Sequence, residues 1–504
     1  MMWMSSPVEG GEALVTGTAD DPNALAGRRV LVMGLGLLGG GVAAARYAVA
    51  QGAAEVVVTD LRGAEVLAPS LAALDGLPIR FVLGQHDEND FRRAEVVVRN
   101  PNVRRDSPYL VVARAAGARV EMEIAWFFRA CWGPIAGVTG TRGKSTTTLL
   151  LHHILERAGM EPLLGGNLGR IDTLALLPQT QAGRWTVLEL GNWMLEGLHT
   201  IQRSPQLAVF TNLLPDHLNA YDSMEDYGAA KTAIYRYQGT DGIALFNDDN
   251  AYTRRYGGEA PGGAVWLYSP ERRLAWRRGA EERAEPFAFA EDIQLRGAHN
   301  LGNVQAAALA ASQVGVAPEV IRAAVRDFGG VPHRLEVVRT LDGVTYVNDS
   351  ASTAPVAGVA ALGSFDEPIV LIAGGNSKRL DASEYATAAA MRCKRVLLLK
   401  GDATTEFAEL VRAAADRAGR PDPVDGPYED FAAAVAAARA APHKAPARAA
   451  RNRACRAASR RRSAARQGMR RTAGSNGYRS PAPRRGSFPT PGWARLTRPA
   501  DNPR

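Results

Sequence analysis

The sequence predicts an α/β protein with three domains followed by a basic tail. A chain of 504 residues is longer than a single domain built around one hydrophobic core usually is. Short apolar runs typical of buried strands alternate with helical segments, and several runs end in glycine-rich turns. Residues 441–504 hold 17 Lys+Arg and one acid, whereas the preceding 440 residues hold 43 Lys+Arg and 51 Asp+Glu. We expect an extension at 1–27, domains at 28–130, 131–330 and 331–440, and then the tail.

Bulk properties favour a soluble protein of the cytoplasm. Hydrophobic residues make up 46% of the chain, but no apolar run reaches the length of a membrane span. The first 15 residues lack the basic start and apolar centre of a signal peptide. Cys131, Cys393 and Cys455 are too widely spaced for a disulfide framework or a metal site, which favours a reducing compartment.

The first domain opens with a dinucleotide-type fingerprint and is predicted to be Rossmann-like. An apolar run at 29–33 is followed by GLGLLG at 34–39 and by an alanine-rich helix that extends to about Gln51. The next strand ends in Asp60, which lies 21 residues after Gly39 and could bond a ribose. This context predicts a nucleotide-type ligand at the helix N-terminus, although such glycines can also serve only close packing.

The second domain begins with a shortened phosphate-binding loop. A strand at 135–138 leads into TGTRGKST at 139–146, and a helix opens at Lys144 and extends to about Ala158. We expect the glycines to leave backbone amides free for phosphate oxygens. Lys144 would then reach the β- and γ-phosphates, and the Ser145 hydroxyl would bind Mg²⁺.

Polar residues follow several later strands and add to this site. Each one alone fits a cap or a core residue as well as a functional group, so their shared position after strands is the stronger indication. In the second domain they are Asn167, Glu189, Asp216, His217, Lys231, His299 and Asn300; in the third domain, which is also predicted to be α/β, they are Arg334, Asp349 and Lys378.

Together these motifs resemble the Mur ligase family over about residues 28–440, and most closely its D-glutamate-adding branch. The ATP-binding loop of this family has the pattern T-G-T/S-x-G-K-S/T. TGTRGKST matches this pattern, so the loop of this chain is as short as the resemblance implies. The resemblance implies three domains, with UDP rather than NAD in the first. It also implies ATP-dependent joining of D-glutamate to UDP-N-acetylmuramoyl-L-alanine in peptidoglycan synthesis, by a monomer that binds no membrane. A folylpolyglutamate-synthase-like ligase, a UDP-sugar-binding pseudoenzyme and a dehydrogenase remain alternatives.

The resemblance also implies residue roles. Lys144, Glu189, His217 and Lys231 would be catalytic, with Lys231 carrying a carbamate. Ser145, Glu189, His217 and the modified Lys231 would hold Mg²⁺ at two sites. ATP would contact Gly140, Thr141, Arg142, Gly143, Lys144, Ser145, Thr146, Asn300, Arg334 and Asp349. The other substrates would contact Leu37, Leu38, Asp60, Arg62, Asn167, Thr353 and Lys378.

The chemistry explains these residue types. Transfer of the γ-phosphoryl group of ATP to a carboxylate gives an acyl phosphate, which an amine then attacks. Two anions must meet in this step, so cations such as Lys144, Arg334 and Mg²⁺ offset the charge. A carbamate would turn Lys231 from a cation into an anionic oxygen ligand, which suits Mg²⁺.

The sequence departs from the family pattern in three places. Ala351 replaces a lysine of the usual NDSKAT, and Gly191-Asn192 replaces the two serines of LELSS. From 441 onward an Arg-, Ala- and Pro-rich tail, predicted to be disordered, stands where the family has a last strand and a loop that grips D-glutamate. We favour an out-of-frame translation over a nucleic-acid-binding function for this tail, so the third domain is expected to be incomplete.

Overall fold

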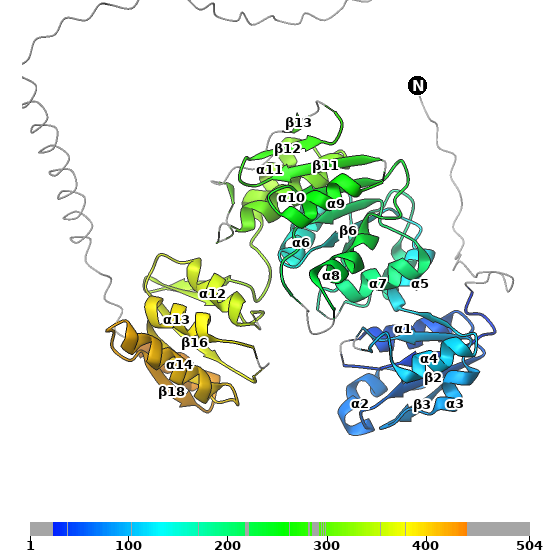
Figure 1. The fold of residues 1–504 in the computed structure, drawn as a ribbon, viewed down its shortest axis with the longest axis horizontal. Coiled ribbons are helices and arrows are strands. Elements are labelled where there is room, and N and C mark those ends of the chain that lie inside the picture. Colours follow the sequence, from blue (N-terminus) through cyan, green and yellow to red (C-terminus); the bar gives the residue numbers. More distant parts are fainter. Residues whose placement is uncertain are drawn as a thin grey trace, which may run out of the picture. The chain divides into compact units, whose positions relative to one another are not determined.

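The structure is a computed structural model that describes residues 24–440, except for residues 38, 102, 170, 217–220, 262, 281–282, 285–291, 294, 296, 298, 353 and 378–379. Within these residues, parallel strands alternate with helices in three successive units, which confirms the predicted α/β class (Figure 1). Most of the N-terminal extension and the whole basic tail lie outside the described residues.

The N-terminal unit is a five-stranded parallel sheet in the order β3-β2-β1-β4-β5. Val30 and Val32 of β1 are buried in one hydrophobic cluster and Leu31 and Met33 in another, as expected when both faces of a parallel sheet are covered by helices. The strand order reverses between β1 and β4, and ligands bind such sheets at the carboxyl ends of these two strands. The elements are β1 (Arg29–Met33), α1 (Gly40–Ala50), β2 (Glu55–Asp60), α2 (Ala64–Ala72), β3 (Ile79–Leu83), α3 (Glu88–Arg93), β4 (Val96–Arg99), α4 (Pro108–Ala115), β5 (Arg119–Glu121) and α5 (Glu123–Ala130).

The central unit contains an eight-stranded sheet in the order β13-β12-β11-β10-β9-β6-β8-β7. The phosphate-loop strand β6 lies between β8 and β9 and runs parallel to both, so three carboxyl ends meet at one edge. Its elements are β6 (Ile135–Thr139), α6 (Lys144–Arg157), β7 (Leu163–Gly166), the 3₁₀ helix η1 (Leu174–Gln179), β8 (Thr186–Glu189), α7 (Asn192–Ile201), β9 (Leu207–Phe210), α8 (Met224–Lys231), the 3₁₀ helix η2 (Thr232–Ile234), β10 (Ile243–Asn247), α9 (Ala251–Glu259), β11 (Ala264–Ser269), β12 (Leu274–Arg277), β13 (Arg283–Ala284), α10 (His299–Gln313) and α11 (Pro318–Asp327).

Two further features of the central unit concern its sheet edge and its helix α10. Strands β12 and β13 are antiparallel additions at one edge of the sheet, and they are short segments between charged residues. Helix α10 begins at His299 and so includes the predicted site residues His299 and Asn300.

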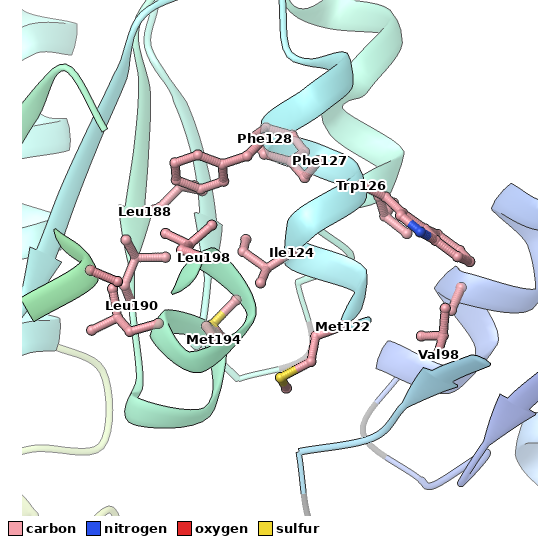
Figure 2. Close-up of a cluster of buried hydrophobic side chains, with 14 of the residues drawn as sticks. Val98, Met122, Ile124, Trp126, Phe127, Phe128, Leu188, Leu190, Met194 and Leu198 are labelled. Carbon is pink, nitrogen blue, oxygen red and sulfur yellow. The ribbon is translucent and has the colours of Figure 1, made fainter. Parts of the chain in front are cut away.

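One hydrophobic cluster joins the first two units. Helix α5 contributes Ile124, Trp126, Phe127 and Phe128, all at most 4% exposed, to a cluster that also contains β1 and α1 residues and residues of β8 and α7. Figure 2 shows Trp126 on the side of Val98 and Ile124 on the side of Met194 and Leu198. This hydrophobic cluster therefore includes residues of both units.

The third unit comprises a two-stranded antiparallel sheet, β14-β15, and a three-stranded parallel sheet, β16-β17-β18. Its own cluster includes Leu362, Val396 and Val411. The elements are β14 (Glu336–Leu341), β15 (Val344–Asn348), α12 (Pro355–Gly363), β16 (Ile369–Gly374), α13 (Ser383–Arg392), β17 (Cys393–Leu399), α14 (Thr404–Arg417), β18 (Val424–Tyr428) and α15 (Phe431–Ala440). In the part of the chain that the structure describes, no helix has the length and apolar character needed to cross a membrane.

Candidate active site

The phosphate loop connects β6 to α6 and depends on two glycines. Gly140 has φ 149° and Gly143, the N-cap of α6, has φ 82°, a region that other residues rarely adopt. A Cβ atom on Gly140 would lie 2.0 Å from Thr211 Oγ1, and one on Gly143 would lie 2.0 Å from Asn303 Oδ1. Space and backbone conformation therefore both require glycine at these positions.

Asn212, which follows β9, anchors the loop. Its carbonyl oxygen accepts a hydrogen bond from the Thr141 N–H (2.9 Å), and its Oδ1 accepts one from the Arg142 N–H (2.9 Å). Two of the amides that the sequence analysis left free for phosphate are thus already used. The first N–H groups of α6 have no partner within the helix, and they can receive an anion. Sequence reasoning missed Asn212, whose position after the neighbouring strand was the available signal.

Lys144 folds back over its own loop. Its Nζ donates to the carbonyl oxygens of Gly140 (3.0 Å) and Thr141 (3.1 Å). Burial lowers the pKa of Lys144, and the negative charges of Glu189 and Asp216 oppose that shift. The ammonium group can exchange these carbonyls for phosphate oxygens without leaving the loop.

Glu189 lies at the end of β8, is 2% exposed and meets two other predicted site residues. Ser145 Oγ donates to its Oε2 (2.6 Å), and Asn167 Nδ2 donates to its Oε1 (2.9 Å). A hydroxyl beside a carboxylate suits Mg²⁺, which takes one or two carboxylates together with phosphate oxygens. No group of three or more His, Cys, Asp or Glu residues with a metal-site arrangement occurs among the described residues.

Lys231 is the last residue of α8 and is fully buried behind the loop. Its Nζ donates to Gly140 O (3.2 Å) and Thr139 Oγ1 (3.4 Å), and also to Asn192 Oδ1. It lies 5.1 Å from the centre of the Tyr227 ring. Burial lowers the pKa of Lys231 well below its usual value, and the charge of Lys144 lowers it further.

The remaining predicted ATP contacts fall in two places. Asn300 is buried in α10 and accepts a hydrogen bond from Asn303 Nδ2 (2.9 Å), and Asn303 lies against Gly143. In the third unit Arg334 is exposed, and Asp349 Oδ1 accepts from the Leu335 N–H (3.0 Å).

Of the other predicted loop residues, Thr146 is buried and Arg142 is exposed. Four predicted residues lie outside the described part of the chain: Leu38, His217, Thr353 and Lys378.

Asp60 holds the glycine turn of the first unit. Its carboxylate accepts from the Gly36 N–H (3.1 Å) and from the Arg62 side chain (2.9 Å to Nη2). Burial would raise the pKa of Asp60, but the hydrogen bonds from Arg62 and Gly36 outweigh burial and hold the pKa below its ordinary value. Leu37 is 41% exposed beside this turn. The carboxylate is thus already engaged, and Arg62 and Leu37 are the groups that face outward.

Glu123, the first residue of α5, lies beside the glycine turn of the first unit and was not singled out in the sequence. Its Oε1 is 3.0 Å from where a Cβ atom on Gly40 would lie, at the first turn of α1. Burial, together with the charge of Asp172, raises the pKa of Glu123 to about 7. An acid held beside the glycine turn therefore titrates near neutral pH.

This shift predicts that Glu123 weakens the fold at high pH. A carboxyl group whose pKa is raised on folding binds its proton more tightly in the native state. The loss of stability caused by its ionisation is therefore absent below about pH 4.5 and complete above about pH 7. We expect Glu123→Gln to become more stable than the wild type as the pH rises through this window, by at most about 3 kcal/mol at pH 8. Urea unfolding at pH 4.5 and pH 8 measures the difference. The exposed Glu65→Gln is the control, and an equal pH dependence for Glu123→Gln and the wild type would disprove the assignment.

Comparison with known proteins gives three consecutive family matches. Residues 28–121 match the Mur ligase MurD-like N-terminal domain, 138–311 match the Mur ligase middle domain, and 333–448 match the Mur ligase glutamate ligase domain. The chain is 48% identical over 442 residues to the UDP-N-acetylmuramoylalanine–D-glutamate ligase of Roseiflexus sp. (strain RS-1), covering 83% of this chain and 92% of the relative. The protein of the same name from Symbiobacterium thermophilum is 36% identical over 427 residues, covering 82% of this chain and 90% of the relative.

The fold also matches a solved structure. The UDP-N-acetylmuramate-alanine ligase of Thermotoga maritima superposes with a TM-score of 0.52 at 20% sequence identity, covering 79% of this chain and 90% of that one. At this identity the likeness concerns the fold alone.

Proposed function

Because the chain belongs to the Mur ligase family, we propose that it uses ATP to join D-glutamate to UDP-N-acetylmuramoyl-L-alanine in peptidoglycan precursor synthesis. The proposal is supported most directly by the phosphate loop, in which Ser145 bonds Glu189 at the end of the adjacent strand. The relatives that cover most of this chain carry the name of that activity.

The reaction needs two steps at one centre. The terminal phosphoryl group of ATP passes to the carboxylate of the L-alanyl group, and a mixed anhydride forms while ADP leaves. The amine of D-glutamate then attacks the carbonyl carbon, the amide bond forms, phosphate leaves with the bonding electron pair, and the amine nitrogen gives up one proton to water. Negative charge gathers at the phosphoryl group in the first step, so Lys144 and the amides at the start of α6 stabilise it.

The oxygen ligands at the end of β8 fit magnesium. We assign Ser145 and Glu189 to one ion, because their oxygens already lie 2.6 Å apart beside the phosphate loop. Bound magnesium would offset the charge of the phosphates during transfer. A second ion held by His217 and by a carbamate on Lys231 stays part of the proposal. It is supported by the burial of the Lys231 amine among neutral oxygen atoms.

The first unit is proposed to hold the UDP part of the substrate. Leu37 and Arg62 lie at the turn after β1 and at the end of β2, at the edge where ligands meet parallel sheets. Asn167, Thr353 and Lys378 remain proposed substrate contacts, and Asn300, Arg334 and Asp349 remain proposed ATP contacts. The domain boundaries, the cytoplasmic location and the monomeric state expected from the sequence also stay predictions.

A thermal-melting experiment tests which nucleotide binds. We expect UDP-N-acetylmuramoyl-L-alanine at 100 times its Kd to stabilise the protein by about 2.7 kcal/mol, because a ligand that binds only the native state must raise Tm. NAD at the same concentration should leave Tm unchanged. The substitution Arg62→Ala should reduce the shift caused by the UDP compound, whereas Arg92→Ala in α3 should not. Stabilisation by NAD alone would contradict the proposed ligase function.

An activity assay separates a working ligase from a pseudoenzyme. Phosphate release that requires ATP, the UDP compound and D-glutamate together is the expected result. Binding of the UDP compound without such release would favour the pseudoenzyme.

A further inference from the structure

Asn192 begins helix α7 three residues after Glu189, and its side chain reaches the amine of Lys231. It stands where the family pattern has a serine. It is 6% exposed, and its Oδ1 accepts a hydrogen bond from Lys231 Nζ. The short segment from Glu189 to Asn192 therefore contains both the carboxylate predicted to bind Mg²⁺ and a side chain that contacts the lysine predicted to carry a carbamate.

The amide nitrogen of Asn192 lacks a well-aligned acceptor among the described residues. Nδ2 is buried, and no acceptor among the described residues lies in hydrogen-bonding geometry with it. The hydroxyl groups of Tyr221 and Tyr227 are its polar neighbours. Burial raises the pKa of both tyrosines, and a weak hydrogen bond from the Asn192 side chain opposes that rise. A buried donor without a well-aligned acceptor destabilises the fold, so this arrangement is explained if a further acceptor completes it.

The amine of Lys231, which bonds the Asn192 side chain, likewise has no anionic partner among the described residues. Neutral oxygen atoms of Thr139, Gly140 and Asn192 surround Nζ, and among the described residues no carboxylate lies within ion-pair distance of it. A carbamate on Nζ would place two acceptor oxygens beside the unused Asn192 donor.

We propose that Asn192 is a positioning residue that stabilises and orients a carbamate on Lys231 by donating from Nδ2 to a carbamate oxygen. The inference rests on the proposed function, which assigns the carbamate to Lys231. The neutral amine donates its electron pair to the carbon of carbon dioxide, an N–C bond forms, and one C=O electron pair moves to oxygen. One proton leaves Nζ for solvent water, so an anionic carbamate remains.

The test measures the modification itself. Purified full-length protein is titrated with ¹³C-labelled bicarbonate, and the carbamate signal is followed by ¹³C NMR. Asn192→Ala should raise the half-saturating bicarbonate concentration about tenfold or more, the factor expected for a hydrogen bond to a charged group. Asn192→Asp should abolish the signal, because a carboxylate would pair with Lys231 as an ammonium ion. Asn192→Ser restores a hydroxyl donor and should recover most of the signal.

Two further variants complete the design. Lys231→Arg should lack the signal and so identifies its source. Thr200→Ala, near the other end of α7, should titrate like the wild type. ATP-induced melting shifts for every variant report whether the fold is retained. Wild-type protein without a signal would overturn the carbamate of the proposed function. A wild-type signal that Asn192→Ala and Asn192→Asp leave unchanged would overturn only the role of Asn192.

Discussion

Replacing Lys144 with alanine should nearly abolish D-glutamate-dependent phosphate release. The ammonium group already lies over the loop, 3.0 Å from Gly140 O, where it can contact a phosphate that the loop receives. Losing its stabilisation of the phosphoryl charge should cost roughly 3 kcal/mol or more, which lowers kcat/KM at least a hundredfold. Initial-rate assays of phosphate release measure the loss.

Two controls show whether that loss is local. Arg157→Ala, at the other end of α6, should keep ordinary rates. Melting shifts with the UDP compound should be unchanged in Lys144→Ala, because that ligand is assigned to the first unit. Turnover by Lys144→Ala within a few-fold of the wild type would remove Lys144 from its role.

Glu196→Ala should destabilise the protein by about 3–5 kcal/mol. Arg99, at the end of β4, donates to Glu196 Oε2 of α7 (2.7 Å), and both side chains are 7% exposed. Tyr221 also donates to Glu196 Oε1 (3.0 Å). Removing the carboxylate leaves a buried guanidinium without its partner. Urea unfolding at pH 7 measures the change.

The double variant Arg99→Met with Glu196→Leu separates an unpaired charge from lost packing. Replacing both members of a buried pair with apolar groups is often neutral, so the double variant should recover much of the lost stability. Asp106→Ala breaks the exposed pair with Arg104 and should change stability by less than about 1 kcal/mol. A Glu196→Ala variant no less stable than Asp106→Ala would show that the buried pair contributes little.

The elements around the site could be predicted because their signals are local. The apolar run before Thr139 and the Gly-Lys-Ser that ends the loop specify β6 and α6, and the structure begins α6 at Lys144 as predicted. Glu189 follows a buried strand, which was enough to place it near the loop. Parallel neighbouring strands end at the same edge, and this geometry brings Ser145 to Glu189.

The missed features depend on contacts between distant segments. Asn212 follows a strand, but that position alone does not say that its side chain supports the loop, because the loop lies 70 residues away in the chain. Asn303, which lies against Gly143, is also distant from the loop in sequence. The raised pKa of Glu123 likewise depends on burial against α1. The sharing of one core by two units arises from α5, whose apolar side chains could equally have served a single domain.

The shared core has a consequence for synthesis on the ribosome. Helix α5 emerges with the first unit, but the α7 residues that cover it, such as Met194 and Leu198, are added about 70 residues later. At roughly 5–20 residues per second this delay lasts on the order of 4 to 14 seconds. During that interval the apolar face of α5 in the nascent first unit is exposed to chaperones and to neighbouring chains. The speed of translation therefore sets how long this face stays uncovered.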